Sequence, residues 1–126
     1  EILVRATLES LAYQTRDVME AMQRDSGLRL RRMQVDGGAA RNNWLMQFQA
    51  DLLGVEVVRP ALVANTAKGA AILAGMTVGW WSGKRSPALR GEPERVFTPR
   101  MPQAIRRRLY AGWQEAVSRV QTRPLG

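Results

Sequence analysis

Apolar positions recur along this chain with two periods, and each period predicts one kind of element. Where apolar residues repeat every three or four positions, the pattern predicts amphipathic helices, expected at residues 2–24, 43–53, 67–80 and 103–120. Where apolar residues alternate or cluster over a few positions, the pattern predicts strands, expected at residues 30–35, 55–58 and 95–98. Because helices and strands alternate, the expected fold class is α/β, with a small parallel sheet flanked by helices.

Each of three helices has an apolar face that is expected to be buried. In the first helix this face consists of Leu8, Leu11, Ala12, Thr15, Val18, Met19 and Met22. In the second and the last helix it consists of Trp44, Leu45, Phe48 and Leu52, and of Ile105, Leu109, Trp113, Ala116 and Val120. Gly27 and Gly54 follow the first two helices and suit the position just after a helix end.

The helix expected at residues 67–80 is unusual because small residues lie on nearly all of its faces. These residues are Gly69, Ala70, Ala71, Ala74 and Gly75. A glycine inside a helix costs about 1 kcal/mol relative to alanine. Close packing against a sheet, another helix or a ligand is the expected compensation, and the pattern does not choose among them.

Length and composition exclude several classes of site. A chain of 126 residues without cysteine or histidine has no disulfide, thiolate zinc site, cysteine nucleophile or imidazole base. Three strands make a small sheet, and Glu1 begins within a predicted helix, so we expect the chain to be part of something larger. No apolar stretch is long enough for a membrane span and no signal peptide is visible, so a cytoplasmic setting is expected.

The net charge of +8 is concentrated in one region. Residues 84–108 contain eight basic and two acidic residues, which is a composition that can bind nucleic acid. Phe97 is the only aromatic residue between positions 82 and 109, so stacking on bases has little support. A solvated basic surface is therefore preferred.

The segment Val35–Asn43 carries the clearest candidate site. Gly37 and Gly38 lie between a predicted strand and a predicted helix, where glycine allows a sharp turn and close approach to the main chain. The helix that follows offers unpaired N–H groups, and Asn42 or Asn43 suits its cap. The segment lacks the spacing of the dinucleotide fingerprint and of the phosphate loop. Taken alone, it fits a tight turn as well as a nucleotide site.

Several segments together resemble the C-terminal portion of glycerol kinases, within the FGGY family of sugar kinases. The resemblance lies in residues 9–18, in 35–39 with Asn42 and Asn43, in 45–51, in 66–67, 69–71 and 73–75, and in 110–113. These segments follow the family's order and span nearly the whole chain. The resemblance implies that residues 1–126 form an incomplete nucleotide-binding lobe of the actin and Hsp70 type, which is ribonuclease H-like.

The resemblance also implies a function and a set of contacts. ATP and glycerol would lie between this lobe and an N-terminal lobe that the chain lacks, and the γ-phosphoryl group of ATP would pass to glycerol. Gly38 and Asn42 would contact the adenosine part of ATP, while Gly37 and Ala39 would shape the turn. The catalytic aspartate and most ligands of Mg²⁺ would lie upstream, so this segment alone has no catalytic or metal residue. Asp36 is expected to stabilise the turn instead, and a homo-oligomer is left open.

Three departures from the family pattern affect these expectations. Lys68 stands where an aliphatic residue is usual, so it must reach solvent or a partner. Arg41 replaces a small residue beside Asn42 and either reaches a phosphate or points outward. Residues 99–108 are basic where some bacterial members are acidic and bind a regulatory phosphotransferase protein, so that partner is not expected.

Alternative functions are another FGGY carbohydrate kinase, such as a xylulokinase, and a non-catalytic nucleic-acid-binding module, which is not favoured.

Overall fold

A computed structural model describes residues 1–61, 65–80 and 93–121 of the chain. Its elements, in order, are α1 (Ile2–Ser26), β1 (Arg32–Gln34), the 3-10 helix η1 (Gly38–Arg41), α2 (Asn43–Leu53), β2 (Glu56–Pro60), α3 (Asn65–Thr77), β3 (Pro93–Phe97) and α4 (Gln103–Val120). All four predicted helices and all three predicted strands are present, and η1 is the element that the sequence pattern did not predict. Most of the expected loop at 82–94 and the tail after residue 121 lie outside the described residues.

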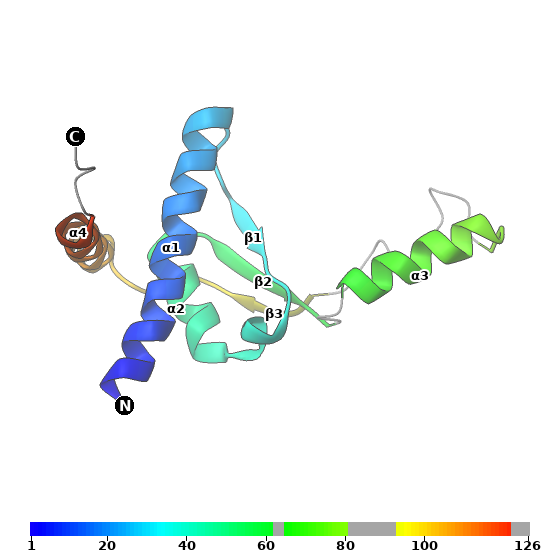
Figure 1. Ribbon diagram of the computed structural model, residues 1–126, viewed down its shortest axis with the longest axis horizontal. Helices are drawn as coiled ribbons and strands as arrows, with labels where there is room; N and C mark the ends of the chain where they lie inside the picture. Colours follow the sequence, from blue (N-terminus) through cyan, green and yellow to red (C-terminus); the bar gives the residue numbers. More distant parts are fainter. Residues whose placement is uncertain (62–64, 81–92, 122–126) are drawn as a thin grey trace.

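The three strands form one sheet in the order β1-β2-β3. β1 and β2 are parallel, with Met33 opposite Val57, as the sequence pattern predicted. β2 and β3 are antiparallel, with Val58 opposite Val96, so the expected parallel pairing is wrong for the last strand. The reason is visible in Figure 1: α3 extends away from the end of β2 and does not cross over the sheet, so β3 returns beside the strand it left.

The core lies between the sheet and a layer formed by α1, α2 and α4. α2 contacts β2 and β3 as well as α1 and α4, and Leu52 of α2 and Val57 of β2 are fully buried. The Tyr13 ring of α1 joins the three helices of this layer, because it meets Phe48 of α2 edge-on at 5.8 Å and stacks on Trp113 of α4 at 5.3 Å between ring centroids. The predicted small sheet flanked by helices is therefore confirmed.

The buried faces of the helices differ in part from the predicted ones. In α1 the buried residues are Ala12 and Tyr13, whereas Leu11, Val18 and Met22 are 41%, 55% and 57% exposed. The cause is that α2 and α4 cover the Tyr13 side of α1. Four other predicted core residues, Trp44, Ile105, Ala116 and Val120, are also exposed.

α3 stands apart from the sheet in Figure 1. A Cβ added at Gly69 would meet no atom within 4 Å, and Leu73 and Trp80 are strongly exposed. Of the small residues expected to pack closely, Ala70, Ala71 and Ala74 are exposed, whereas Gly75 is buried. Lys68, which departs from the family pattern, is half-buried on the same helix. No described helix has the length and apolarity that crossing a membrane requires.

Two arginines meet the C-terminal end of α2, where the carbonyl groups carry partial negative charge. Arg16 Nη1 of α1 donates a hydrogen bond of 3.3 Å to the Leu52 carbonyl. The guanidinium of Arg106 of α4 occupies the space that a Cβ at Gly54 would fill. Gly54 has φ of 70° and Gly27, at the end of α1, has φ of 69°, so both predicted helix ends are confirmed.

These two glycines separate backbone strain from the effect of Arg106. We expect Gly27→Ala to cost about 1 kcal/mol, because alanine is strained at positive φ and a Cβ there meets nothing within 4 Å. Gly54→Ala should cost about 0.5–1 kcal/mol more, because the new Cβ displaces a cation from the end of α2. Urea denaturation followed by circular dichroism measures both. In an Arg106→Ala background the excess cost at Gly54 should disappear, and an unchanged excess would contradict this role of Arg106.

Candidate functional site

The candidate turn connects the end of β1 to the start of α2. The Val35 N–H extends the strand pairing by donating to the Val58 carbonyl at 3.1 Å. The Asp36 carboxylate then accepts a hydrogen bond of 2.7 Å from the N–H of Gly37, so its expected role in stabilising the turn is confirmed. Gly37 has φ of 88°, which a residue with a Cβ adopts only under strain. Glycine at position 37 is therefore required by the backbone.

Gly38 differs from Gly37, because nothing in its described surroundings requires a glycine. It is not among the residues with positive φ, and a Cβ added there would meet no atom within 4 Å. Neither the backbone nor the packing of the described residues therefore requires glycine at this position. Gly37, Gly38 and Ala39 are exposed, whereas Ala40 is 2% exposed. The turn thus presents bare main chain on its outer side and packs its inner side on the core.

Asn42 caps α2 and is one of the two residues, Asn42 and Asn43, that the sequence offered for this position. Its side-chain oxygen accepts a hydrogen bond of 3.1 Å from the Leu45 N–H, and its carbonyl accepts one of 3.0 Å from Met46. η1 lies between the two glycines and α2, and the cap satisfies the Leu45 N–H, which is one of the N–H groups in the first turn of α2. The side-chain NH₂ of Asn42, an exposed residue, is the group suited to donating to a ligand. Arg41, beside it, is exposed.

The inner side of the turn is held by Arg59 of β2, which sequence reasoning missed. Arg59 is 7% exposed, and its Nη1 donates to the Ala40 carbonyl at 2.9 Å and to the Asn43 side-chain oxygen at 2.9 Å. The Arg41 carbonyl lies at 3.4 Å from the same nitrogen. A charged residue inside the hydrophobic run Val57–Arg59 was the available signal, because a buried guanidinium needs oxygen partners.

An open groove of about 500 Å³ lies beside the turn, between α1, β1 and α2. Leu11, Val18, Met33 and Val35 contribute to its largely apolar lining, and Asp36 and Ala39 lie at its border with the turn. Gln49 of α2 also lines it and donates a hydrogen bond of 3.0 Å to Thr15. Leu11 and Val18, which were predicted to lie in the core, therefore line this groove instead.

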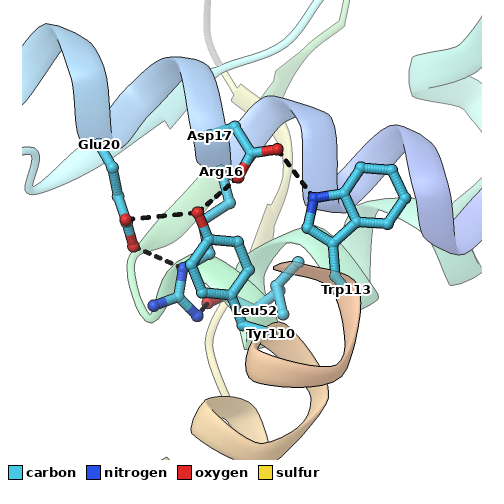
Figure 2. Close-up of polar contacts among 6 residues, drawn as sticks. All are labelled: Arg16, Asp17, Glu20, Leu52, Tyr110 and Trp113. Carbon is cyan, nitrogen blue, oxygen red and sulfur yellow. Dashed lines mark hydrogen bonds and ion pairs between the residues drawn. The ribbon is translucent and has the colours of Figure 1, made fainter. Parts of the chain in front are cut away.

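A second polar cluster lies where α1 meets α4 (Figure 2). The Asp17 carboxylate accepts hydrogen bonds from the Tyr110 hydroxyl and, at 2.8 Å, from the Trp113 indole N–H. Arg16 pairs with Glu20 at 2.8 Å, and its guanidinium lies 3.8 Å from the centroid of the Tyr110 ring. Because the charges and donors of this cluster satisfy one another, its role is to fasten α4 to α1. The sequence pattern had placed Tyr110 outside the buried stripe of the last helix.

The environment of the cluster perturbs the acidity of Tyr110. Burial is the main cause that raises the pKa of its hydroxyl, and the hydrogen bond to Asp17 and the charges of Glu20 and Asp17 add to it. Arg16 opposes these effects only in part. Burial also raises the pKa of Tyr13.

A model of the C-terminal domain of the FGGY family of carbohydrate kinases matches residues 1–78. The chain belongs to this family. The glycerol kinase of Petrotoga mobilis is 57% identical over 119 residues, which cover 94% of this chain and 24% of that protein. The glycerol kinase of Alkaliphilus metalliredigens is 56% identical over the same share of each chain. The chain thus spans about a quarter of the length of the curated relatives it matches.

Solved structures of FGGY kinases share the fold. A Plasmodium falciparum glycerol kinase with ADP matches 95% of this chain and 24% of its own, with a TM-score of 0.78 and 30% identity. A ligand-bound xylulose kinase from Lactobacillus acidophilus matches 94% of this chain and 24% of its own, with a TM-score of 0.77 and 17% identity, and so supports the fold alone. The FGGY resemblance and the actin- and Hsp70-like fold class expected from the sequence are confirmed.

The Tyr110 cluster predicts how stability depends on pH. Because the folded state raises the pKa of Tyr110, its contribution is complete below about pH 10, the ordinary pKa of tyrosine, and is lost as the pH rises further. Tyr110→Phe should lower the free energy of unfolding by about 1 kcal/mol at pH 8 and should flatten the loss of stability above pH 10. Urea denaturation at several pH values measures both effects.

Tyr13→Phe is the matched control for this prediction. It keeps the ring that contacts Phe48 and Trp113, so its stability at pH 8 should stay close to that of the unaltered chain. Equal stability of Tyr110→Phe and the unaltered chain at pH 8 would show that the cluster does not fasten α4 to α1.

Proposed function

We propose that this chain is the ATP-binding portion of a glycerol kinase, which transfers the γ-phosphoryl group of ATP to glycerol to give glycerol 3-phosphate. The observation that carries the proposal is Gly38, an exposed glycine that neither its backbone conformation nor its neighbours require. A missing Cβ at such a position serves close approach of a ligand to the main chain. The 55–57% identity to glycerol kinases supports the choice of reaction.

In this proposal the turn holds the nucleotide and does not perform the chemistry. Gly37 sets the direction of the main chain, Gly38 and Ala39 leave room for the adenosine part of ATP, and Asn42 donates a hydrogen bond through its side-chain NH₂. Phosphoryl transfer depends on positioning the nucleotide and neutralising phosphate charge. Holding ATP in place is therefore a contribution to rate that requires no catalytic side chain in this segment.

In this proposal the base and the metal ligands lie in the upstream part of the full protein. Asp36 is bonded to the Gly37 N–H, and Asp17 is bonded to Tyr110 and Trp113. Among the described residues, no group of three acidic, histidine or cysteine side chains could hold a metal ion. Mg²⁺ bound with ATP would neutralise phosphate charge, and upstream residues would hold it. A cytoplasmic location, where ATP is the phosphoryl donor, belongs to the same proposal.

Another FGGY kinase activity is the second candidate, because xylulose kinases share the fold. The identity to their solved structures is 17–28%, which is close to the 30% identity to the solved glycerol kinase but well below the 55–57% identity to the curated glycerol kinases. The identities therefore favour glycerol over a sugar.

A fusion protein tests the proposed reaction. The upstream three quarters of the Petrotoga mobilis glycerol kinase, joined to this complete chain in place of the matching 119 residues, should phosphorylate glycerol with ATP. A coupled assay of ADP release, run with glycerol, xylulose and other polyols, measures activity and preference. Preference for xylulose would favour the second candidate, and no activity on any acceptor together with no nucleotide binding would overturn the proposal.

Substitutions in the turn test which residues contact the nucleotide. Gly38→Ala in the fusion should leave the melting temperature unchanged, because the new Cβ meets no described atom, and should raise the KM for ATP about tenfold. Asn42→Ser should keep the helix cap but should also raise the KM for ATP, because serine lacks the NH₂ group. The KM for glycerol serves as the internal control. An unchanged KM for ATP in both variants would exclude this turn as the nucleotide site.

A further inference from the structure

The Arg59 side chain connects the sheet to the inner side of the turn. It leaves the middle strand, β2, and its Nη1 reaches the carbonyl of Ala40 and the side chain of Asn43, each at 2.9 Å. Ala40 lies between the proposed contact residues Gly38 and Asn42, and Asn43 directly follows Asn42. A single guanidinium therefore spans the part of the turn that sets the spacing of the two contacts.

The bonds that Arg59 makes are of the kind that fixes geometry. The guanidinium is planar and presents its donors in a fixed arrangement, and hydrogen bonds from a charged donor are stronger than neutral ones. Arg59 is 7% exposed, so water competes little for these bonds. Its position is itself fixed, because β2 pairs with β1 on one side and β3 on the other.

Among residues 1–61, 65–80 and 93–121, none gives the outer side of the turn comparable support. Gly37, Gly38 and Ala39 are exposed, and the hydrogen bond from the Gly37 N–H to the Asp36 carboxylate is local. The bonds within η1 join near neighbours along the chain, such as Ala40 N–H to the Gly37 carbonyl at 3.1 Å. The long-range polar contacts of this turn among the described residues therefore come from Arg59.

We propose that Arg59 is a positioning residue for nucleotide binding: its guanidinium holds η1 and the start of α2 so that Gly38 and Asn42 meet the nucleotide together. This inference rests on the proposed function. Arg59 does not touch the nucleotide, and it acts through the Ala40 carbonyl and Asn43. Losing it loosens the turn and weakens the binding of ATP and ADP without changing the glycerol site or the phosphoryl-transfer step.

The test uses the fusion described above, with Arg59→Met, Arg59→Lys and Asn43→Ala. Arg59→Met should raise the KM for ATP and the Kd for a fluorescent ADP analogue about tenfold. The KM for glycerol and the kcat at saturating ATP should stay within about twofold. Arg59→Lys, which keeps a cationic donor, should recover part of the affinity. Asn43→Ala removes one exposed acceptor and leaves Arg59 in place, so it should give a smaller increase in a fully folded protein.

Arg95→Met is the matched control. Arg95 of β3 lies opposite Arg59 of β2 in the strand register. Both guanidinium groups lie over the Phe97 ring, that of Arg95 at 4.9 Å and that of Arg59 at 5.6 Å from the ring centroid. It is exposed, and its loss should change the nucleotide constants by less than about twofold. Melting temperatures of all variants, measured without nucleotide, separate loss of folding from loss of binding.

The outcomes separate this inference from the proposed function. If the unaltered fusion phosphorylates glycerol while the Arg59 variants lower only the melting temperature or the active fraction, Arg59 is merely structural and the inference is wrong. Parallel increases in the KM values for ATP and glycerol would overturn it as well. If the unaltered fusion neither binds the ADP analogue nor phosphorylates any acceptor, the proposed function fails and this inference fails with it.

Discussion

A positive charge buried in the middle strand constrains the arrangement of this structure. A guanidinium removed from water is tolerated only where oxygen atoms replace its hydration. Arg59 lies in β2 among the buried residues Val57, Val58 and Phe97, and part of its hydrogen bonding goes to η1 and Asn43. The sheet can therefore bury Arg59 only when the turn adopts the conformation that supplies these oxygen atoms. The same requirement that stabilises the strand determines where bare main chain is presented.

α2 is held at both ends and along its side, which makes it a rigid support for the turn. Asn42 caps its start, and Arg16 and Arg106 meet its end. On its side, the Asp51 carboxylate accepts hydrogen bonds from the N–H groups of Arg100 and Met101 at 2.6 and 3.2 Å. These bonds fix the segment between β3 and α4 to α2. A binding turn gains precision when the element that follows it cannot shift.

Periodicity predicted the existence and order of the helices and strands because it reports which residues are apolar, and that is the main determinant of these elements. It was less reliable for which face is buried. The apolar stripe of α1 contains Leu11 and Val18, yet the polar residues Arg16 and Asp17 hold α4, because hydrogen bonds and a cation–π contact fasten that side. A hydrophobic pattern contains no information about such polar contacts. It also did not contain the direction of β3, which depends on where α3 extends.

The candidate turn, like the fold, was predictable from the sequence only in part. Two glycines between a strand and a helix indicated the place, and the cap was predicted to be Asn42 or Asn43. The intervening η1 was not predicted, because a single 3-10 turn leaves no periodic pattern. Arg59 lies 16 residues after Asn43 in the chain, and its contact exists only because parallel pairing of β1 and β2 brings the two segments together. Contacts of this kind follow from the assembled sheet and not from local sequence.

Two kinds of residue in the described structure have surroundings that do not suit their chemistry, exposed apolar side chains and an exposed glycine that no turn requires, and the two have different implications. Leu11, Val18 and Leu73 are apolar and exposed, and covering such residues with any apolar surface lowers the free energy of the protein. Gly38 is exposed main chain without a side chain, and it gains nothing from general apolar contact. It contributes only when a group that needs the room of a missing Cβ comes within contact distance. The proposal that Gly38 meets a nucleoside names such a group, and a protein surface meets the requirement less well, because side chains on a protein partner could adjust to an alanine in place of this glycine.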